Sequence, residues 1–169
     1  MTIRYWPFYC EENIWHLCED PVVDVPVDER KVIVITGARG RVAMRRQREG
    51  GARPVFWDYH VVLGAQGKIW DLDTTLGLPV ELARWTRESF LPHYRDFAPR
   101  FRIVDAPTFR ARFASDRSHM RGPDGTTLKP PPPWPPIGEG MTLPRFIDMD
   151  AAFVGEVCDL DSLQAAFPP

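Results

Sequence analysis

The stretch PVFWDYHVVLGAQGKIWDLDTTL, residues 54–76, constrains the fold of this chain more than any other segment. Two runs rich in β-branched and aromatic residues flank GAQG, whose glycines permit a tight turn, so the stretch predicts an antiparallel β-hairpin. Successive strand side chains point to opposite faces, which places Phe56, Asp58, His60 and Val62 on one face of the first strand. The many apolar neighbours indicate that the hairpin is largely buried.

The register of this hairpin decides which acid faces His60. If the turn has two or four residues, His60 lies directly opposite Asp71, and Asp58 lies opposite Asp73. Directly opposed residues have Cβ atoms about 4.5–5.5 Å apart, close enough for a carboxylate to accept an imidazole N–H. An odd-length turn would move Asp71 to the other face. A surface ion pair is the simpler alternative, but burial makes an unpaired histidine or aspartate costly, which favours a specific buried pair.

The segment YCEENIWHLCEDP, residues 9–21, predicts a short amphipathic helix that ends at its Asp-Pro pair. Cys10 lies one turn before Ile14 and therefore on the buried face. Glu11 and Glu12 complement the positive end of the helix dipole, but adjacent carboxylates disfavour a thiolate. A reactive thiol here needs a cationic partner such as an imidazolium, with both acids directed to solvent. Otherwise the cysteine is a small buried hydrophobe.

Cys10, His60 and Asp71 together would form a thiol triad. His60 would hold Cys10 as the thiolate of an ion pair, and Asp71 would fix the imidazole tautomer. A nucleophile at a helix start with its partners on a sheet is the papain-like and transglutaminase-like arrangement.

Composition limits the class of protein. The chain has 169 residues, of which 44% are hydrophobic and 12% aromatic, so we expect a single globular domain over residues 1–169. Its 21 basic and 23 acidic residues argue against a general nucleic-acid binder. Since no apolar run approaches the ~20 residues that span a bilayer, and the start lacks a signal-peptide core, we expect a cytoplasmic protein without a membrane segment.

The metal-binding residue types do not form a recognisable motif. The three cysteines, Cys10, Cys18 and Cys158, lack zinc-site spacing and are odd in number, so we expect free thiols. His60 with Asp58, Asp71 and Asp73 supplies one histidine and alternating acids, which is not a specific ligand pattern.

Other segments complete the expected core: strands at residues 31–36, 41–47 and 100–106, a helix at 78–92 with Leu78, Leu82 and Trp85 on one face, and a short helix capped by Thr142. An arginine-rich cluster within residues 39–53 is expected to be a solvated hairpin and loop.

KPPPPWPPI, residues 129–137, predicts polyproline II. It is either an SH3-type or WW-type ligand or a strap held across the domain by Trp134 and Ile137, and we favour the strap because Trp134 would otherwise be exposed.

The polar stretch FASDRSHM, residues 113–120, has two interpretations. It is either a loop tied down by its own hydrogen bonds or part of a substrate pocket. His119 competes with His60 for the role of base, but it lacks an equally well-placed acid.

Six motifs, YCEENIWHLCE, VFWDYHVVL, IWDLDTTL, FASDRSHM, PPPPWPPI and FIDMD, occur in an order that resembles the protein N-terminal glutamine amidohydrolase family. The resemblance covers most of residues 9–150 and implies that Cys10, His60 and Asp71 are the triad. It also implies an α/β (α+β) fold of the transglutaminase-like or papain-like kind, in which helices flank an antiparallel sheet, and a monomer without metal or organic cofactor. The turn GAQGK is shorter than in animal members, and GARGRVAMRRQREGG departs from them.

The implied reaction is hydrolysis of the side-chain amide of a protein's or peptide's N-terminal glutamine to glutamate and ammonia, without nucleic-acid or membrane partners. Such a site has to read a free α-amino group. Candidate substrate-binding residues are Glu11, Asp58, Asp73, Ser115, Asp116 and His119. Two alternatives are a related thiol peptidase or transglutaminase, and a noncatalytic adaptor that presents the proline segment.

Overall fold

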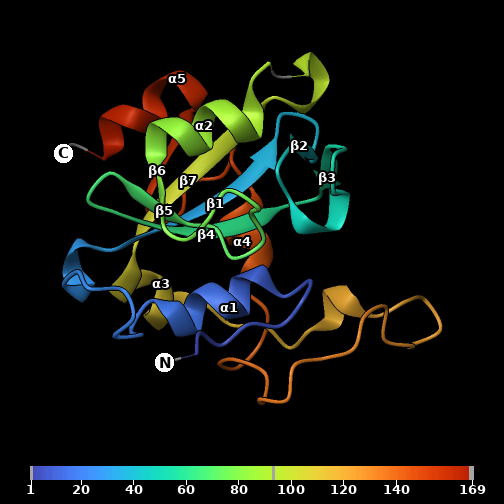
Figure 1. Ribbon diagram of the computed structural model, residues 1–169. Coiled ribbons are helices and arrows are strands. Elements are labelled where there is room, and N and C mark those ends of the chain that lie inside the picture. The colour runs from blue at the N-terminus through green and yellow to red at the C-terminus, as the bar shows by residue number, and fades with distance from the viewer. Residues whose placement is uncertain (1, 93, 168–169) are drawn as a thin grey trace.

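A computed structural model describes residues 2–92 and 94–167. Its centre is a six-stranded antiparallel sheet of order β6-β5-β4-β1-β7-β8 (Figure 1). Its strands are β1 (Lys31–Gly37), β4 (His60–Ala65), β5 (Lys68–Trp70), β6 (Val80–Glu81), β7 (Pro99–Asp105) and β8 (Glu156–Asp159). A separate ribbon pairs β2 (Val42–Met44) with β3 (Val55–Trp57).

Helices cover both faces of this sheet (Figure 1). One face packs against α1 (Cys10–Leu17), α3 (Ala106–Arg112) and α4 (Leu143–Ile147), and the other against α2 (Leu82–Phe90) and α5 (Leu160–Leu163). Short 3-10 helices occur at Val27–Glu29, Arg48–Gly50, Arg95–Phe97, Ser118–Met120 and Gln164–Ala166. The expected mixed α/β class with helices flanking an antiparallel sheet is confirmed.

The central strand β1 explains why its sequence is continuously apolar. Val32 and Val34 belong to the core on the α1 side, while Ile33 and Ile35 belong to the core on the α2 side. Alternating side chains thus enter two separate cores, and a strand covered on both faces has no solvent-facing positions to fill with polar residues. The strands expected at 31–36 and 100–106 are both present as β1 and β7.

The hairpin of β4 and β5 forms, but its register differs from the expected one. Its turn is Gln66-Gly67, with φ of 46° and 69°, and Ala65 pairs with Lys68. Positive φ at both central residues suits the twist of a tight hairpin, and Gly67 adopts it without steric cost. Because the register moves by two residues, side chains keep their faces, but His60 is not opposite Asp71. The strand β5 ends at Trp70, so Asp71 lies beyond the paired part of the hairpin.

The predicted first strand of the hairpin is interrupted. Residues 58–59 separate β3 from β4, so only β4 joins the main sheet. The strand β2 pairs with β3 instead of lying beside β1, because Val42 and Met44 align with Trp57 and Val55. Asp58 therefore does not face Asp73 across the hairpin, contrary to expectation. Its carbonyl instead accepts a hydrogen bond from the Thr36 hydroxyl at 2.7 Å.

One helix boundary and one helix cap differ from expectation. The helix predicted at 78–92 begins only at Leu82, because Val80 and Glu81 form β6 against β5. Leu82 and Trp85 are buried as expected, whereas Leu78 is exposed. Thr142 does not cap α4 with its side chain. Its hydroxyl instead donates to the Arg112 carbonyl at 2.9 Å and accepts from the Ala114 amide at 2.8 Å.

The proline segment packs as a strap, as predicted. Ile137 is buried in the core on the α1 side, and Trp134 is half-buried. The Trp134 indole donates to Glu12 of α1 at 2.7 Å, and the Trp6 indole donates to the Pro130 carbonyl at 2.8 Å. These bonds join the strap to the beginning of the chain.

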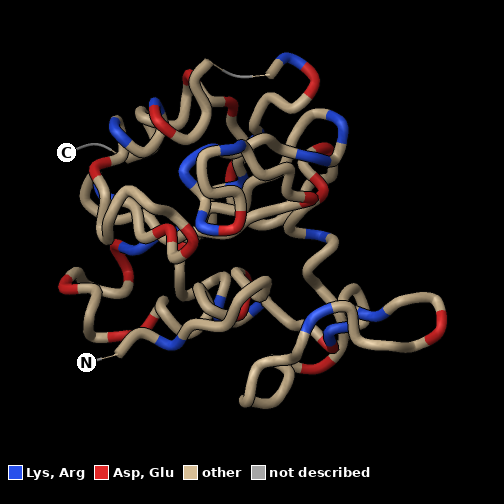
Figure 2. Tube along the Cα trace, turned by 45° about the vertical axis from the view of Figure 1, so that its right-hand side comes forward, with Lys and Arg blue, Asp and Glu red and all other residues tan. Residues whose placement is uncertain are grey.

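The arginine side chains of this segment are exposed or partly exposed, and basic and acidic residues are interspersed along the chain (Figure 2). Arg39 pairs with Asp96 at 3.2 Å, Arg41 with Asp58 at 3.5 Å and Arg46 with Glu88 at 3.3 Å. In the described part of the chain, none of the helices has the length and apolar character needed to cross a bilayer.

Candidate active site

Cys10 is the first residue of α1, and its side chain is 9% exposed. It shares the buried face of the helix with Ile14 and Leu17, as the spacing predicts. Asn13 fixes the entry to the helix, because its side chain accepts from the Trp6 amide at 2.8 Å and donates to the Trp6 carbonyl at 2.9 Å. All three cysteines are free.

His60 begins β4 and forms the predicted pair with Asp71. His60 Nε2 lies 2.9 Å from Asp71 Oδ1, and both side chains are almost completely buried. The pairing β4–β5 starts only at Leu63, so the edge of β4 beside His60 has no β5 partner. Asp71 follows the end of β5 and occupies this space. The pair therefore forms around the end of a strand and not across the hairpin.

Asp71 is held by donors that the sequence did not single out. Its Oδ2 accepts from Gln47 Nε2 and from Trp85 Nε1, each at 3.0 Å, and its Oδ1 also accepts from the Asp73 amide at 3.1 Å. Gln47 lies in an arginine-rich stretch, and Trp85 matched an ordinary core position, so neither carried a recognisable signal.

Trp57 closes a ring of side chains around this pair. Its indole stacks on the His60 imidazole, and its Nε1 donates to Gln47 Oε1 at 3.3 Å. Gln47 in turn donates to Asp71, which binds His60. The imidazole is thus held at its face by Trp57 and at Nε2 by Asp71.

The protonation of the pair follows from its surroundings. Burial raises the pKa of Asp71, but the stronger combined effect of His60, Trp85 and Gln47 lowers it. Burial likewise lowers the pKa of His60, and the nearby carboxylates, chiefly Asp71, outweigh it and raise that pKa. An ionised carboxylate only accepts hydrogen bonds, so Nε2 is the donor, and in the neutral imidazole Nδ1 can accept a proton.

The thiol of Cys10 is unfavourably placed for ionisation on its own. Burial, followed by the carboxylates of Glu11 and Asp73, raises the pKa of Cys10 well above its usual value, and the backbone N–H of Val61 acts in the opposite direction. A thiolate at this position therefore requires a nearby cation.

A pocket of about 230 Å³ brings Cys10 and His60 together. Asp58, Tyr59 and Asp73 also line it. The remaining walls are formed by Phe8, Trp57, Met120, Leu128 and Lys129. Thus a thiol, an imidazole and a carboxylate meet in a small, mostly apolar cavity that is open to substrate.

The expectation that Glu11 and Glu12 face solvent is wrong, since both are 0% exposed. Glu12 accepts two hydrogen bonds from Arg117, both at 2.8 Å, and one from Trp134. Glu11 Oε2 lies 3.6 Å from Cys10 Sγ, and its Oε1 lies 3.3 Å from His119 Nε2. Arg117 and Trp134, both distant in sequence, compensate the buried charge of Glu12, whereas Glu11 Oε1 accepts no hydrogen bond among the described residues.

The three remaining candidate residues, His119, Ser115 and Asp116, are not among the residues that line the pocket. His119 lies behind the pocket wall, 3.1 Å from the Tyr59 hydroxyl. Ser115 is completely buried and accepts from the Arg117 amide at 3.2 Å, while Asp116 is exposed and accepts from the Ser118 amide at 2.9 Å. Of this segment, Met120 lines the pocket, while Arg117 and His119 contact Glu12 and Glu11 of α1.

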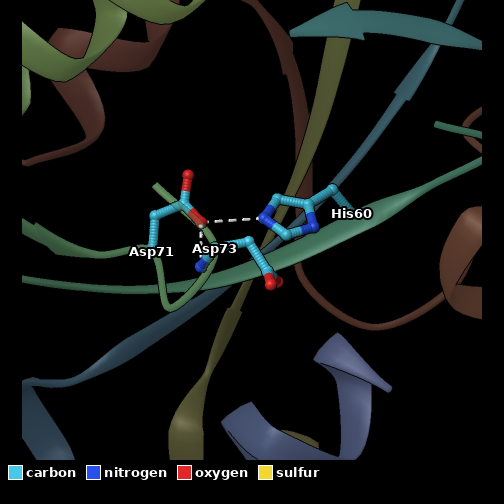
Figure 3. Close-up of side chains that lie close together, drawn as sticks. All are labelled: His60, Asp71 and Asp73. Carbon is cyan, nitrogen blue, oxygen red and sulfur yellow. Dashed lines mark hydrogen bonds and ion pairs between the residues drawn. The ribbon is translucent and has the colours of Figure 1, made fainter. Parts of the chain in front are cut away.

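His60, Asp71 and Asp73 also have donor atoms within 4.8 Å of one another, the spacing of a possible metal site (Figure 3). The chemistry of the set argues otherwise. Both oxygens of Asp71 already accept protein hydrogen bonds, and His60 Nε2 is one of the donors. A metal ion at Asp71 would have to displace these contacts.

A cysteine at a helix start beside a buried His–Asp pair is the residue set of thiol hydrolases. A model of the family described as N-terminal glutamine amidase matches residues 5–167, and the chain belongs to that family.

Curated relatives agree. The chain is 39% identical to a human protein N-terminal glutamine amidohydrolase, over 86% of this chain and 78% of that protein. Proteins of the same name from Arabidopsis thaliana and Danio rerio are 35% and 36% identical, each over 96% of this chain and over 83% and 88% of their own length.

Proposed function

We propose that this protein hydrolyses the side-chain amide of an N-terminal glutamine in proteins or peptides, giving glutamate and ammonia. The observation that carries the proposal is the pocket in which Cys10 meets the His60–Asp71 pair, in a chain of the N-terminal glutamine amidase family.

In the first half of the reaction, His60 Nδ1 takes the proton from Cys10, and the thiolate attacks the amide carbon. The tetrahedral intermediate collapses as the imidazolium protonates the departing nitrogen, which leaves as ammonia. A thioester joins Cys10 to the former glutamine side chain. Asp71 keeps Nε2 protonated and stabilises the imidazolium throughout.

In the second half, His60 removes a proton from a water molecule that attacks the thioester. The new intermediate expels the Cys10 thiolate, which recovers its proton from the imidazolium, and a glutamate side chain is released. No cofactor enters this balance, because water supplies the oxygen and the two protons.

The developing oxyanion needs hydrogen-bond donors. The backbone N–H of Cys10 is the candidate, because the first N–H groups of a helix have no partner within it. Such a donor typically contributes about 2.7–4 kcal/mol to transition-state stabilisation. A nucleophile at a helix start facing a sheet-borne histidine supports a papain-like or transglutaminase-like assignment.

Ammonia release from a matched peptide set tests the proposal. The set comprises a peptide that begins with Gln, its N-acetylated form, a peptide with Gln inside, one that begins with Asn, and free glutamine. Only the first should react well, and Cys10→Ala is the blank. An Asn side chain is one methylene shorter, and misplacement of the amide by about 1 Å can cost about 100-fold in rate. Equal release from the internal Gln would leave a general thiol amidase and reject N-terminal selectivity.

A further inference from the structure

We infer that the carboxylate of Asp73 binds the α-ammonium group of the substrate's first residue, and that Tyr5 positions this carboxylate. The inference rests on the proposed function and names the group that would distinguish a free N-terminus from an internal or acetylated glutamine.

The position of Asp73 suits this role. Asp73 lines the pocket together with Cys10 and His60, and its carboxylate lies within 4.8 Å of a ring nitrogen of His60 (Figure 3). In glutamine, four bonds of about 1.5 Å separate the α-nitrogen from the amide carbon, so these atoms are at most about 5 Å apart. An ammonium held by Asp73 therefore leaves the side-chain amide within reach of the catalytic pair.

The charge of Asp73 is available for a ligand. Within residues 2–92 and 94–167, no Lys, Arg or His side chain forms an ion pair with Asp73. The one side-chain hydrogen bond it accepts in this part of the structure comes from the Tyr5 hydroxyl to Oδ1, at 2.6 Å. An α-ammonium with three N–H donors would supply the missing cation and bind the remaining lone pairs.

The other acids of the region are less suitable. Glu11 is completely buried and lies against His119 and the Cys10 thiol. Asp58 lines the pocket, but its side chain is 83% exposed and pairs with Arg41. A charge that remains in solvent discriminates weakly between ligands, because water and salt screen it. Asp73 therefore remains the acid within the pocket that combines partial burial with a free oxygen.

Tyr5 holds Asp73 from the N-terminal segment. Its hydroxyl donates to Oδ1, which leaves Oδ2 for the ligand, and the Arg48 guanidinium lies over the Tyr5 ring, 5.4 Å from its centroid. The next residue, Trp6, is anchored to Asn13 of α1. The segment that leads to the nucleophile therefore also orients the proposed amino-binding group.

Binding at Asp73 would also affect the nucleophile. The Asp73 carboxylate is one of the charges that raise the pKa of Cys10. An ammonium bound there neutralises part of this field, so a substrate with a free amino group makes its own attacking thiolate less costly. A substrate without that group leaves the full field in place.

A two-by-two experiment tests the inference. Ammonia release is measured with wild type and Asp73→Asn, each with a Gln-initiated peptide and its desamino counterpart, in which hydrogen replaces the ammonium. Wild type should prefer the amino peptide in kcat/KM by on the order of 100-fold, because an unpaired buried acceptor strongly penalises the analogue. In Asp73→Asn the preference should fall below about tenfold. Asp58→Asn is the matched control and should keep the wild-type ratio.

Asp73→Ser provides a second replacement if the amide disturbs the loop, and it should give the same reduced ratio. Tyr5→Phe retains the carboxylate and should lower the ratio less, mainly through KM. A wild-type ratio in both Asp73 variants overturns the inference while the proposed function stands. If wild type releases no ammonia from the Gln peptide, the proposed function fails, and the inference fails with it.

Discussion

The indole of Trp57 lies nearly parallel to the imidazole of His60, with ring centroids 5.7 Å apart and 12° between the planes. This stack restricts the ring's orientation about the Nε2–Asp71 hydrogen bond. The same indole donates to Gln47, which in turn donates to Asp71. A substitution at Trp57, Gln47 or Asp71 should therefore change the orientation of the His60 imidazole.

Gln47→Leu should lower kcat/KM. The substitution removes a donor to Asp71 Oδ2 and an acceptor for the Trp57 indole, a loss of about 1–3 kcal/mol or roughly 5- to 150-fold in rate. The pKa of Asp71 should also rise, because Gln47 is one of the groups that lower it. Steady-state kinetics across acidic and neutral pH measure both effects, with the exposed Gln164→Leu as control. Unchanged kinetics would show that Trp85 alone suffices to hold Asp71.

His60→Ala should slow alkylation of Cys10. Burial and the carboxylates of Glu11 and Asp73 raise the pKa of this thiol, so the imidazolium is needed for the thiolate. Below the pKa of the thiol, each unit by which that pKa rises makes the thiolate fraction about tenfold smaller. The rate of iodoacetamide labelling near neutral pH, followed at Cys10 by mass spectrometry, measures the effect. An equal rate in both proteins would reject the proposed ion pair.

Asp71→Asn and Asp73→Asn should damage different kinetic constants. An amide at Asp71 favours the wrong imidazole tautomer, which costs on the order of 10⁴-fold in kcat in related triads. Asp73 does not hydrogen-bond the imidazole, so its variant should act mainly on recognition of the N-terminus. Comparison of kcat and KM for the two variants with one Gln peptide decides. A larger loss of kcat in Asp73→Asn would reverse the assignment of the orienting acid.

Arg117→Ala should destabilise the fold. It leaves the completely buried Glu12 without its cation, and breaking a buried ion pair typically costs about 3–5 kcal/mol. The exposed pair of Arg39 and Asp96 is the matched control, and Arg39→Ala should change the free energy of unfolding by less than about 1 kcal/mol. Urea titrations of the three proteins measure the difference. Equal midpoints would contradict the expected contribution of the buried ion pair to stability.

The His60–Asp71 pair should make stability depend on pH with a defined sign. The pKa of His60 is raised in the folded state, so its contribution is complete below the unfolded pKa of about 6.5 and is lost as the pH rises through the folded value. The free energy of unfolding of wild type relative to His60→Gln should therefore decline towards alkaline pH. If the difference in free energy of unfolding between wild type and His60→Gln grows towards alkaline pH, burial, which lowers the pKa of His60, outweighs Asp71.

Local periodicity predicted much of this fold and part of the site. The apolar run at residues 31–36, the buried face of α1 and the even-length turn all depend on neighbours in sequence. The partnership of His60 with Asp71 was predicted for a related reason, although the register was displaced by two residues. A shift of two preserves the face, and the two side chains therefore still meet.

Contacts between distant segments set the remaining features. Glu12 is buried because Arg117 and Trp134, 105 and 122 residues away, surround it. Tyr5 reaches Asp73 across 68 residues, and Gln47 reaches Asp71 across 24. No periodic pattern links such positions, so the burial of the acids and the ring around His60 could not be derived from one sequence.

The buried Glu12 accepts hydrogen bonds from both Arg117 and Trp134, so the burial of α1 depends on residues that are synthesised much later than the helix itself. A growing chain presents Cys10 early, whereas Arg117 and Trp134, which bind Glu12, are made 105 and 122 residues after that glutamate. Before Arg117 and Trp134 are made, Glu12 has no partner to replace its hydration, so we expect the start of α1 to remain outside the core. We therefore expect a chain truncated before Arg117 to carry Cys10 without the proposed release of ammonia.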